Sequence, residues 1–169
     1  HFWQSLPLKP GVDANKVRFV PCAARPEVLA RRNKTRTDGP VLVYQTSSTN
    51  HDLPGTLRTA AENGKLKFRV YGAGKVGVDD KNADVEYCAF SEQGFLDDLA
   101  AAPFVVVNGG HSTMVEALAL GKAVVAEPVQ GHYEQILNAK GLEALGVGVH
   151  VEEVSAAALV EFAGRAAAC

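Results

Sequence analysis

Short apolar runs that alternate with helix-like segments place the strongest constraint on this fold. After Pro40 the chain switches repeatedly between the two, and residues 104–107 are apolar at every position. A strand that is covered by helices on both faces has this character, and the alternation is typical of a parallel sheet. We therefore predict an α/β fold with a doubly wound parallel sheet. The expected strands are 41–44, 68–71, 85–88, 104–107, 123–126 and 147–151, and the expected helices are 56–63, 94–102, 113–120, 134–145 and 156–168.

Composition limits the size and the partners of this fold. The chain has 169 residues, 47% of them hydrophobic, which is enough for one core and too few for two ordinary domains. A net charge of -2 argues against a nucleic-acid partner, which would need a basic surface. Cys22, Cys88 and Cys169 form no C-x-x-C pair, so we expect no disulfide framework, no zinc site and a cytoplasmic location. The sequence has no run long enough to span a membrane and no signal peptide, and its first residue is not methionine, so we expect a piece of a longer chain.

Residues 1–40 are expected to be a linker, and residues 41–169 the folded domain. Prolines and glycines interrupt the first stretch and leave room for one short strand, at 17–20. From Arg25 to Arg36 the chain holds five basic residues and a single acid. We interpret this basic segment as a solvated linker or helix face, with peripheral contact to an anionic membrane or partner as the alternative.

A literal G-x-G-x-x-G runs from Gly72 to Gly77, directly after an expected strand. In a dinucleotide-binding unit the third glycine lies in the first turn of a helix that points at the pyrophosphate. Here the polar, turn-favouring residues 78–84 follow, without the apolar spacing of a helix. We interpret the motif as a glycine-rich turn.

The loop after the fourth expected strand carries the residues best suited to a phosphate. Ligands of an open parallel sheet bind beyond the carboxyl ends of its strands. Gly109 and Gly110 allow close backbone approach, and Ser112 and Thr113 bring N–H groups and hydroxyls at a helix start. Glu116 lies one turn further and can accept hydrogen bonds from a vicinal diol, such as that of ribose. The alternative is a Ser/Thr cap with Glu116 closing a capping box.

Hydrogen-bonding side chains also follow the next strand. Residues 130–135 read Gln-Gly-His-Tyr-Glu-Gln, and Asn138 follows one turn later. Such donors and acceptors suit sugar hydroxyls. The two loops therefore predict one binding site at the carboxyl edge of the sheet.

At these residues the sequence resembles the C-terminal halves of GT-B glycosyltransferases. It resembles in particular the peptidoglycan N-acetylglucosaminyltransferase-like branch and related uncharacterised bacterial and archaeal proteins. The resemblance covers residues 40–169 and rests on N-G-G-x-S-T-x-x-E-A-L-x-x-G-K-A from Asn108, P-x-x-G-x-x-E-Q-x-x-N-A from Pro128, and L-G-V-G from Leu145. It implies a single Rossmann-like domain that binds a nucleotide-sugar donor, with UDP as the expected nucleotide.

The resemblance also implies which residues bind the donor. It assigns the diphosphate to Gly109, Gly110, Ser112 and Thr113, and the ribose hydroxyls to Glu116.

Further donor contacts follow from the same resemblance. Glu134 and Gln135 would contact the donor sugar, Ser47 would add a phosphate contact, and Phe90 would lie near the base. Asn108 departs from the pattern, because many relatives carry a basic residue or a histidine there. Either the diphosphate affinity is modest, or His111 supplies the missing positive charge; His132 joins the donor site. For both histidines an ordinary loop position is the alternative.

The resemblance implies a mechanism that needs a second domain. In GT-B enzymes the N-terminal domain contacts the acceptor and usually supplies the base, so the catalytic residue is unknown here and this chain alone is expected to be inactive as a hexosyltransferase. Helix-terminus amides would stabilise the departing nucleoside diphosphate, and we expect no metal and no cofactor. Two alternatives stay open: a UDP-sugar 2-epimerase-like domain, and a non-catalytic nucleotide-binding or protein-interaction module.

We expect no NAD or NADP binding at the glycine motif, because no helix is predicted after it. Calorimetric titration of the chain with both dinucleotides tests this expectation. Binding in the micromolar range that Gly74→Val abolishes would show that the motif is a dinucleotide site.

Overall fold

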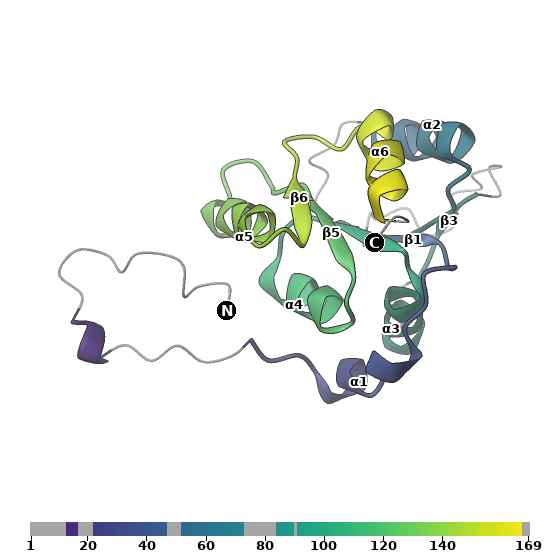
Figure 1. The fold of residues 1–169 in the computed structure, drawn as a ribbon. Coiled ribbons are helices and arrows are strands. Elements are labelled where there is room, and N and C mark those ends of the chain that lie inside the picture. The colour runs from purple at the N-terminus through teal and green to yellow at the C-terminus, as the bar shows by residue number, and fades with distance from the viewer. Residues whose placement is uncertain (1–12, 17–21, 47–51, 73–83, 90, 167–169) are drawn as a thin grey trace.

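A single sheet of six parallel strands forms the centre of the molecule (Figure 1). The computed structural model describes residues 13–16, 22–46, 52–72, 84–89 and 91–166. The strand order is β3-β2-β1-β4-β5-β6, and every neighbouring pair is parallel. The predicted doubly wound, Rossmann-like α/β fold is therefore confirmed.

The strands lie close to their predicted positions. Four of the six, β1, β2, β4 and β5, have the predicted bounds, because continuous apolar runs mark buried strands. The two outer strands are each shorter than expected. The strands are β1 (Val41–Tyr44), β2 (Phe68–Tyr71), β3 (Val85–Tyr87), β4 (Phe104–Val107), β5 (Ala123–Ala126) and β6 (Gly148–His150).

Helices cover both faces of the sheet (Figure 1). Successive side chains of a strand point to opposite faces, so Val41 and Val43 pack with α2 and α6, whereas Leu42 packs with the core shared by α3, α4 and α5. The helices are α1 (Pro26–Leu29), α2 (Leu53–Gly64), α3 (Glu92–Ala101), α4 (His111–Ala119), α5 (Tyr133–Ala144) and α6 (Ala156–Ala166), with short 3-10 turns η1 (Ala14–Lys16) and η2 (Arg32–Lys34).

Polar side chains mark where the helices begin. Asp52, Ser91 and Ser155 each accept a hydrogen bond from a backbone N–H in the first turn of the helix that follows, at 3.1, 3.3 and 3.2 Å. Such caps satisfy N–H groups that have no partner within the helix. The predicted cap at Ser155 is confirmed. Gly121, predicted to end α4 in a left-handed conformation, has φ of 70° there.

The chain from Ala24 to Pro40 is docked on the sheet domain. Val28 of α1 is fully buried in the same core as α3 and α4. Further on, the N–H groups of Arg36 and Gly39 donate to the carbonyls of Ala100 and Ala101 at 2.8 and 3.0 Å. These bonds anchor part of the predicted linker to the end of α3.

A buried lysine also holds the segment that precedes β1. The Lys122 side chain is buried and donates to the carbonyl of Arg36. Burial lowers the pKa of this ammonium group. A hydrogen bond therefore links the residue before β5 to the segment that precedes β1.

The glycine motif begins at a tightly packed position. Gly72 follows β2 with φ of 83°, and a Cβ there would lie 2.8 Å from the carbonyl oxygen of Gln45. Glycine adopts this conformation without strain. Residues 73–77 lie outside the described part of the chain, so the role of the motif stays a prediction.

No described helix is long and apolar enough to cross a membrane.

Candidate functional site

The strand order defines a crevice at the carboxyl edge of the sheet. The chain proceeds from β1 to β2 and β3 on one side, and from β4 to β5 and β6 on the other. The reversal therefore falls between β1 and β4, and ligands of open α/β sheets bind at such a point. The loops after β1, β4 and β5 all begin here.

Asn108 ties these three loops together. Its side-chain oxygen accepts from the Thr46 N–H at 2.9 Å, and its amide nitrogen donates to the Glu127 carbonyl at 3.3 Å. Only 5% of the residue is exposed. Asn108, which departs from the pattern that the resemblance implies, therefore holds the loops in place.

A second buried pair crosses the same edge. The Gln45 amide donates to the Glu127 carboxylate at 2.8 Å, and both side chains are buried. Sequence analysis did not identify either residue. The signal was present, because a polar residue directly follows each of the apolar strands β1, β4 and β5.

The helix start predicted to hold a phosphate has the required shape. Gly109 has φ of 86°, and Gly110 occupies the N-cap position without any side-chain cap. Helix α4 begins at His111, two residues before the predicted start, so Ser112 and Thr113 lie inside its first turn. The capping-box alternative for Glu116 is wrong, because glycine supplies no capping side chain.

The loop between β5 and α5, which was predicted to contact the donor sugar, is held by hydrogen bonds within the loop and by one from α5 to the loop before α4. The Gln135 side-chain oxygen accepts from the Val129 N–H at 2.8 Å, and the Val129 carbonyl accepts from the His132 N–H at 2.9 Å. The buried Asn138 donates to the Gly109 carbonyl at 3.0 Å. This part of the motif therefore joins the two glycine-containing loops.

Two predicted donor residues at this loop remain exposed. His132 is the N-cap residue of α5, and Glu134 lies in its first turn. His111 and Thr113 are half-buried, and Ser112 is exposed. The predicted residues Ser47 and Phe90 lie outside the described part of the chain.

A pocket of about 230 Å³ opens beside the start of α4. Ser112, Thr113 and Glu116 form one side of it. Tyr44 and Phe95 form an apolar side, with their rings in an edge-to-face contact at 5.3 Å. Ala23 and Arg25 complete the lining. Three of the predicted donor-binding residues therefore share one pocket.

Arg25 binds the carboxylate of Glu116. Its Nε donates to Oε1 at 2.5 Å and its Nη2 donates to Oε2 at 3.0 Å, a bidentate pair. Its Nη1 donates to Glu92 of α3 at 2.6 Å. The hydrogen bond with Glu116 raises the pKa of Arg25, because a carboxylate favours the charged guanidinium.

Sequence analysis placed Arg25 in a solvated segment and missed this contact. The available signal was the Arg25-Pro26 step, since proline restricts the residue before it to an extended backbone and favours the first turn of a helix. Arg31 of the same segment also pairs with α3, at 2.8 Å from Asp97 and 2.7 Å from Gln93. Membrane contact through this segment stays a prediction.

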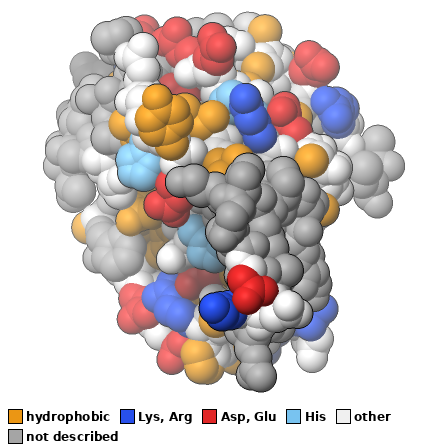
Figure 2. Space-filling model, turned by 90° about the vertical axis from the view of Figure 1, so that its left-hand side faces the viewer, with side chains coloured by type: hydrophobic (Ala, Val, Ile, Leu, Met, Phe, Trp, Pro, Cys, Tyr) orange, Lys and Arg blue, Asp and Glu red, His pale blue; other side chains and the backbone are white. Residues whose placement is uncertain are grey.

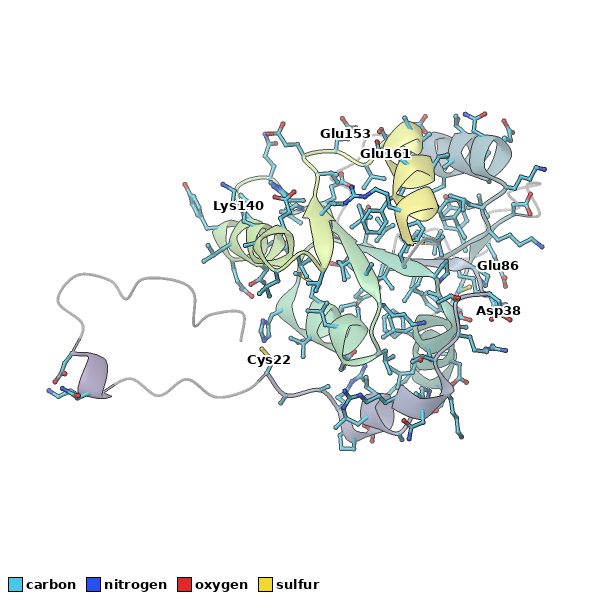
Figure 3. The ribbon with its side chains drawn as sticks, viewed as in Figure 1. Cys22, Asp38, Glu86, Lys140, Glu153 and Glu161 are labelled. Carbon is cyan, nitrogen blue, oxygen red and sulfur yellow. The ribbon has the colours of Figure 1, made fainter. Side chains whose placement is uncertain are left out.

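A second pocket, of about 590 Å³, lies on the outer side of α5. The loop 128–131, Lys140 and Glu153 are part of its lining (Figure 3). Figure 2 looks at the molecule from this side and shows acidic and basic side chains interspersed. The described lining of this second pocket includes none of residues 133–135 at the start of α5 and no pair of aromatic rings, in contrast to the pocket at α4.

The fold is that of GT-B glycosyltransferase structures. The glycotransferase of kitacinnamycin matches with a TM-score of 0.60 and 23% identity, over 90% of this chain and 38% of that chain. Arabidopsis thaliana UGT89C1 complexed with UDP matches with a TM-score of 0.58 and 18% identity, over 95% and 42%. VinC in complex with dTDP matches with a TM-score of 0.57 and 14% identity, over 86% and 36%.

The sequence model described as Glycosyl transferase family 1 matches residues 5–166. The chain therefore belongs to this family.

Curated relatives match over shorter stretches. An uncharacterized glycosyltransferase of Methanosarcina mazei is 48% identical over 44 residues, which are 26% of this chain and 12% of the relative. The UDP-N-acetylglucosamine--N-acetylmuramyl-(pentapeptide) pyrophosphoryl-undecaprenol N-acetylglucosamine transferase of Legionella pneumophila (strain Corby) is 30% identical over 104 residues, 57% of this chain and 29% of the relative. The chain thus covers less than a third of either relative.

Asn138→Ala should lower the free energy of unfolding by about 1–3 kcal/mol, because it leaves the Gly109 carbonyl without its buried donor. Urea denaturation measures the change. Lys140→Ala, on the exposed side of the same helix, is the control and should stay within about 0.5 kcal/mol of the original. Equal losses in both variants would show that the Asn138 contact does not support the loop.

Proposed function

We propose that this chain is the donor-binding domain of a glycosyltransferase that moves a sugar from a nucleoside diphosphate, with UDP as the expected nucleotide, to an acceptor hydroxyl. The observation that carries the proposal is the pocket at the carboxyl edge, where the first turn of α4 and the Glu116 carboxylate share one lining. Family membership supports the transferase over the epimerase-like alternative.

The diphosphate would lie against the start of α4. N–H groups in the first turn of a helix have no partner within the helix, and its dipole favours negative charge there. The Gly110 cap leaves this turn without a competing side chain, and the hydroxyls of Ser112 and Thr113 add donors. The same groups would stabilise the charge that develops on the departing nucleoside diphosphate.

The ribose would lie deeper, at Glu116. An ionised carboxylate accepts hydrogen bonds only, so it suits the two donors of a vicinal diol. Solved structures of this fold hold UDP and dTDP, which share a diphosphate. UDP carries the vicinal diol, whereas dTDP lacks the 2′-hydroxyl and has one methyl group more on its base. The exposed Glu134 and His132 would meet the donor sugar at the mouth of the loop.

Acceptor contacts and the base would come from a second domain. GT-B transferases place these groups in their N-terminal half, and this chain covers about 36 to 42% of the solved relatives named above. Sugar transfer would then take place between the two halves.

Residues 1–169 should bind UDP and a UDP-sugar but should not transfer the sugar. The donor contacts lie within this chain, whereas the base and the acceptor contacts do not. Calorimetry measures the binding, and chromatography with a panel of acceptors measures the transfer. Slow donor hydrolysis is compatible with the proposal because water can replace the acceptor; efficient transfer by this chain alone is not.

Glu116→Gln should weaken UDP binding at least tenfold. A hydrogen bond to a charged group contributes about 1.5–3 kcal/mol, and about 1.4 kcal/mol corresponds to a factor of ten. Glu92→Gln is the matched control, because it removes the other carboxylate bound to Arg25 but lies outside the pocket lining. The UDP affinity of Glu92→Gln should differ from that of the original chain by less than about twofold. Equal effects in the two variants would assign Glu116 to the support of Arg25 alone.

A further inference from the structure

We propose that Arg25 and the donor ribose compete for the Glu116 carboxylate, which makes Arg25 a latch that a donor must displace. The inference rests on the proposed function, because it takes Glu116 as the ribose-binding residue. It adds Arg25, which lies outside the donor-binding motifs, to the site. It also means that donor binding has to break the pair between Arg25 and Glu116.

The competition follows from the geometry of the pair. Both oxygens of Glu116 accept from Arg25, so the guanidinium covers the edge of the carboxylate that a diol would use. A bidentate arginine pair of this kind is stronger than a single contact. The Glu116 side chain is only 7% exposed, and Arg25 lines the same pocket. A ribose can therefore reach the two oxygens only after the guanidinium has moved.

A guanidinium displaced from Glu116 would keep its contact with Glu92 and gain contact with solvent. Its side chain is 42% exposed, and its Nη1 already binds Glu92, whose side chain is 54% exposed. Release from Glu116 thus leaves Arg25 paired with one carboxylate and open to water. The charge of Arg25 stays compensated by Glu92, and the buried Glu116 carboxylate exchanges the guanidinium for the ribose hydroxyls, so neither charge is left buried without a partner.

The backbone at Arg25 can stay in place during this exchange. Pro26 restricts Arg25 to its extended conformation, with φ of -61° and ψ of 147°. The Arg25 carbonyl accepts from the N–H groups of Val28 and Leu29 at 3.0 and 3.1 Å, and Val28 is buried in the core. The latch is therefore a side-chain movement on a fixed support.

The latch lowers the affinity for any donor with a ribose diol. A ligand that must first break a contact binds with an apparent affinity reduced by the cost of breaking it. Arg25→Gln removes the charge and the bidentate fork, so it should raise the affinity for the diol.

Uridine is the probe, because it carries the diol but no phosphate that could attract the guanidinium. The affinity of Arg25→Gln for uridine should rise by roughly three- to tenfold, the range expected when an ion pair of modest strength no longer competes. NMR titration measures it. The rise should be smaller for 2′-deoxyuridine, which has lost one of the two donors. Arg25→Lys keeps the charge without the fork and should fall between Arg25→Gln and the original chain.

Arg31→Gln is the control, since Arg31 belongs to the same segment and pairs with Asp97 and Gln93 on α3 but does not line the pocket. Its uridine affinity should not change. Unchanged or weaker uridine binding by both Arg25 variants would overturn the latch, as would an equal rise for uridine and 2′-deoxyuridine. UDP binding by the original chain is measured first: its absence would refute the proposed function itself, whereas UDP binding without the Arg25 effect would refute only the latch.

Discussion

The two hydrogen bonds of the Asn108 side chain are the constraint on which the site depends. They join the ends of β1, β4 and β5 at a residue that is only 5% exposed, where an unpaired amide would be costly. The buried Gln45–Glu127 pair reinforces the same edge. Because these bonds fix where the loops leave the sheet, the pocket residues on α4 are placed by groups that do not themselves line the pocket.

The sheet could be predicted closely from the sequence, and the contacts between its loops could not. Apolar runs such as 104–107 reveal buried strands because both faces need covering, and this information is local. The start of α4 was predicted two residues late, since Ser112 and Thr113 resemble caps whereas the cap is Gly110. Among the described candidate residues near α4, three share a pocket, namely Ser112, Thr113 and Glu116, whereas Asn108, Gly109, Gly110 and His111 are not part of its lining. The structural roles of Asn108 and Asn138 depend on partners in other loops, which a motif does not name.

The pairing of Arg25 with Glu116 illustrates this limit most clearly. The two residues are 91 positions apart, and neither composition nor spacing relates them. A run of basic residues resembles a solvated surface when its acidic partners, here on α3 and α4, are far away in the sequence. Burial of Val28 in the core holds α1 against the domain, and Arg25 and Arg31 on either side of it then reach the acids of α3 and α4.

The ordered conformation of the loop between β5 and α5 affects how much conformational entropy is lost when a ligand binds there. Its turn is held by the bonds between Val129, His132 and Gln135, and Asn138 anchors the helix that follows to Gly109. A loop that is already folded loses little conformational entropy when a ligand arrives. Its contacts with a sugar would therefore contribute their free energy almost undiminished, and selectivity among sugars would come from a rigid template and not from a loop that adapts to each one.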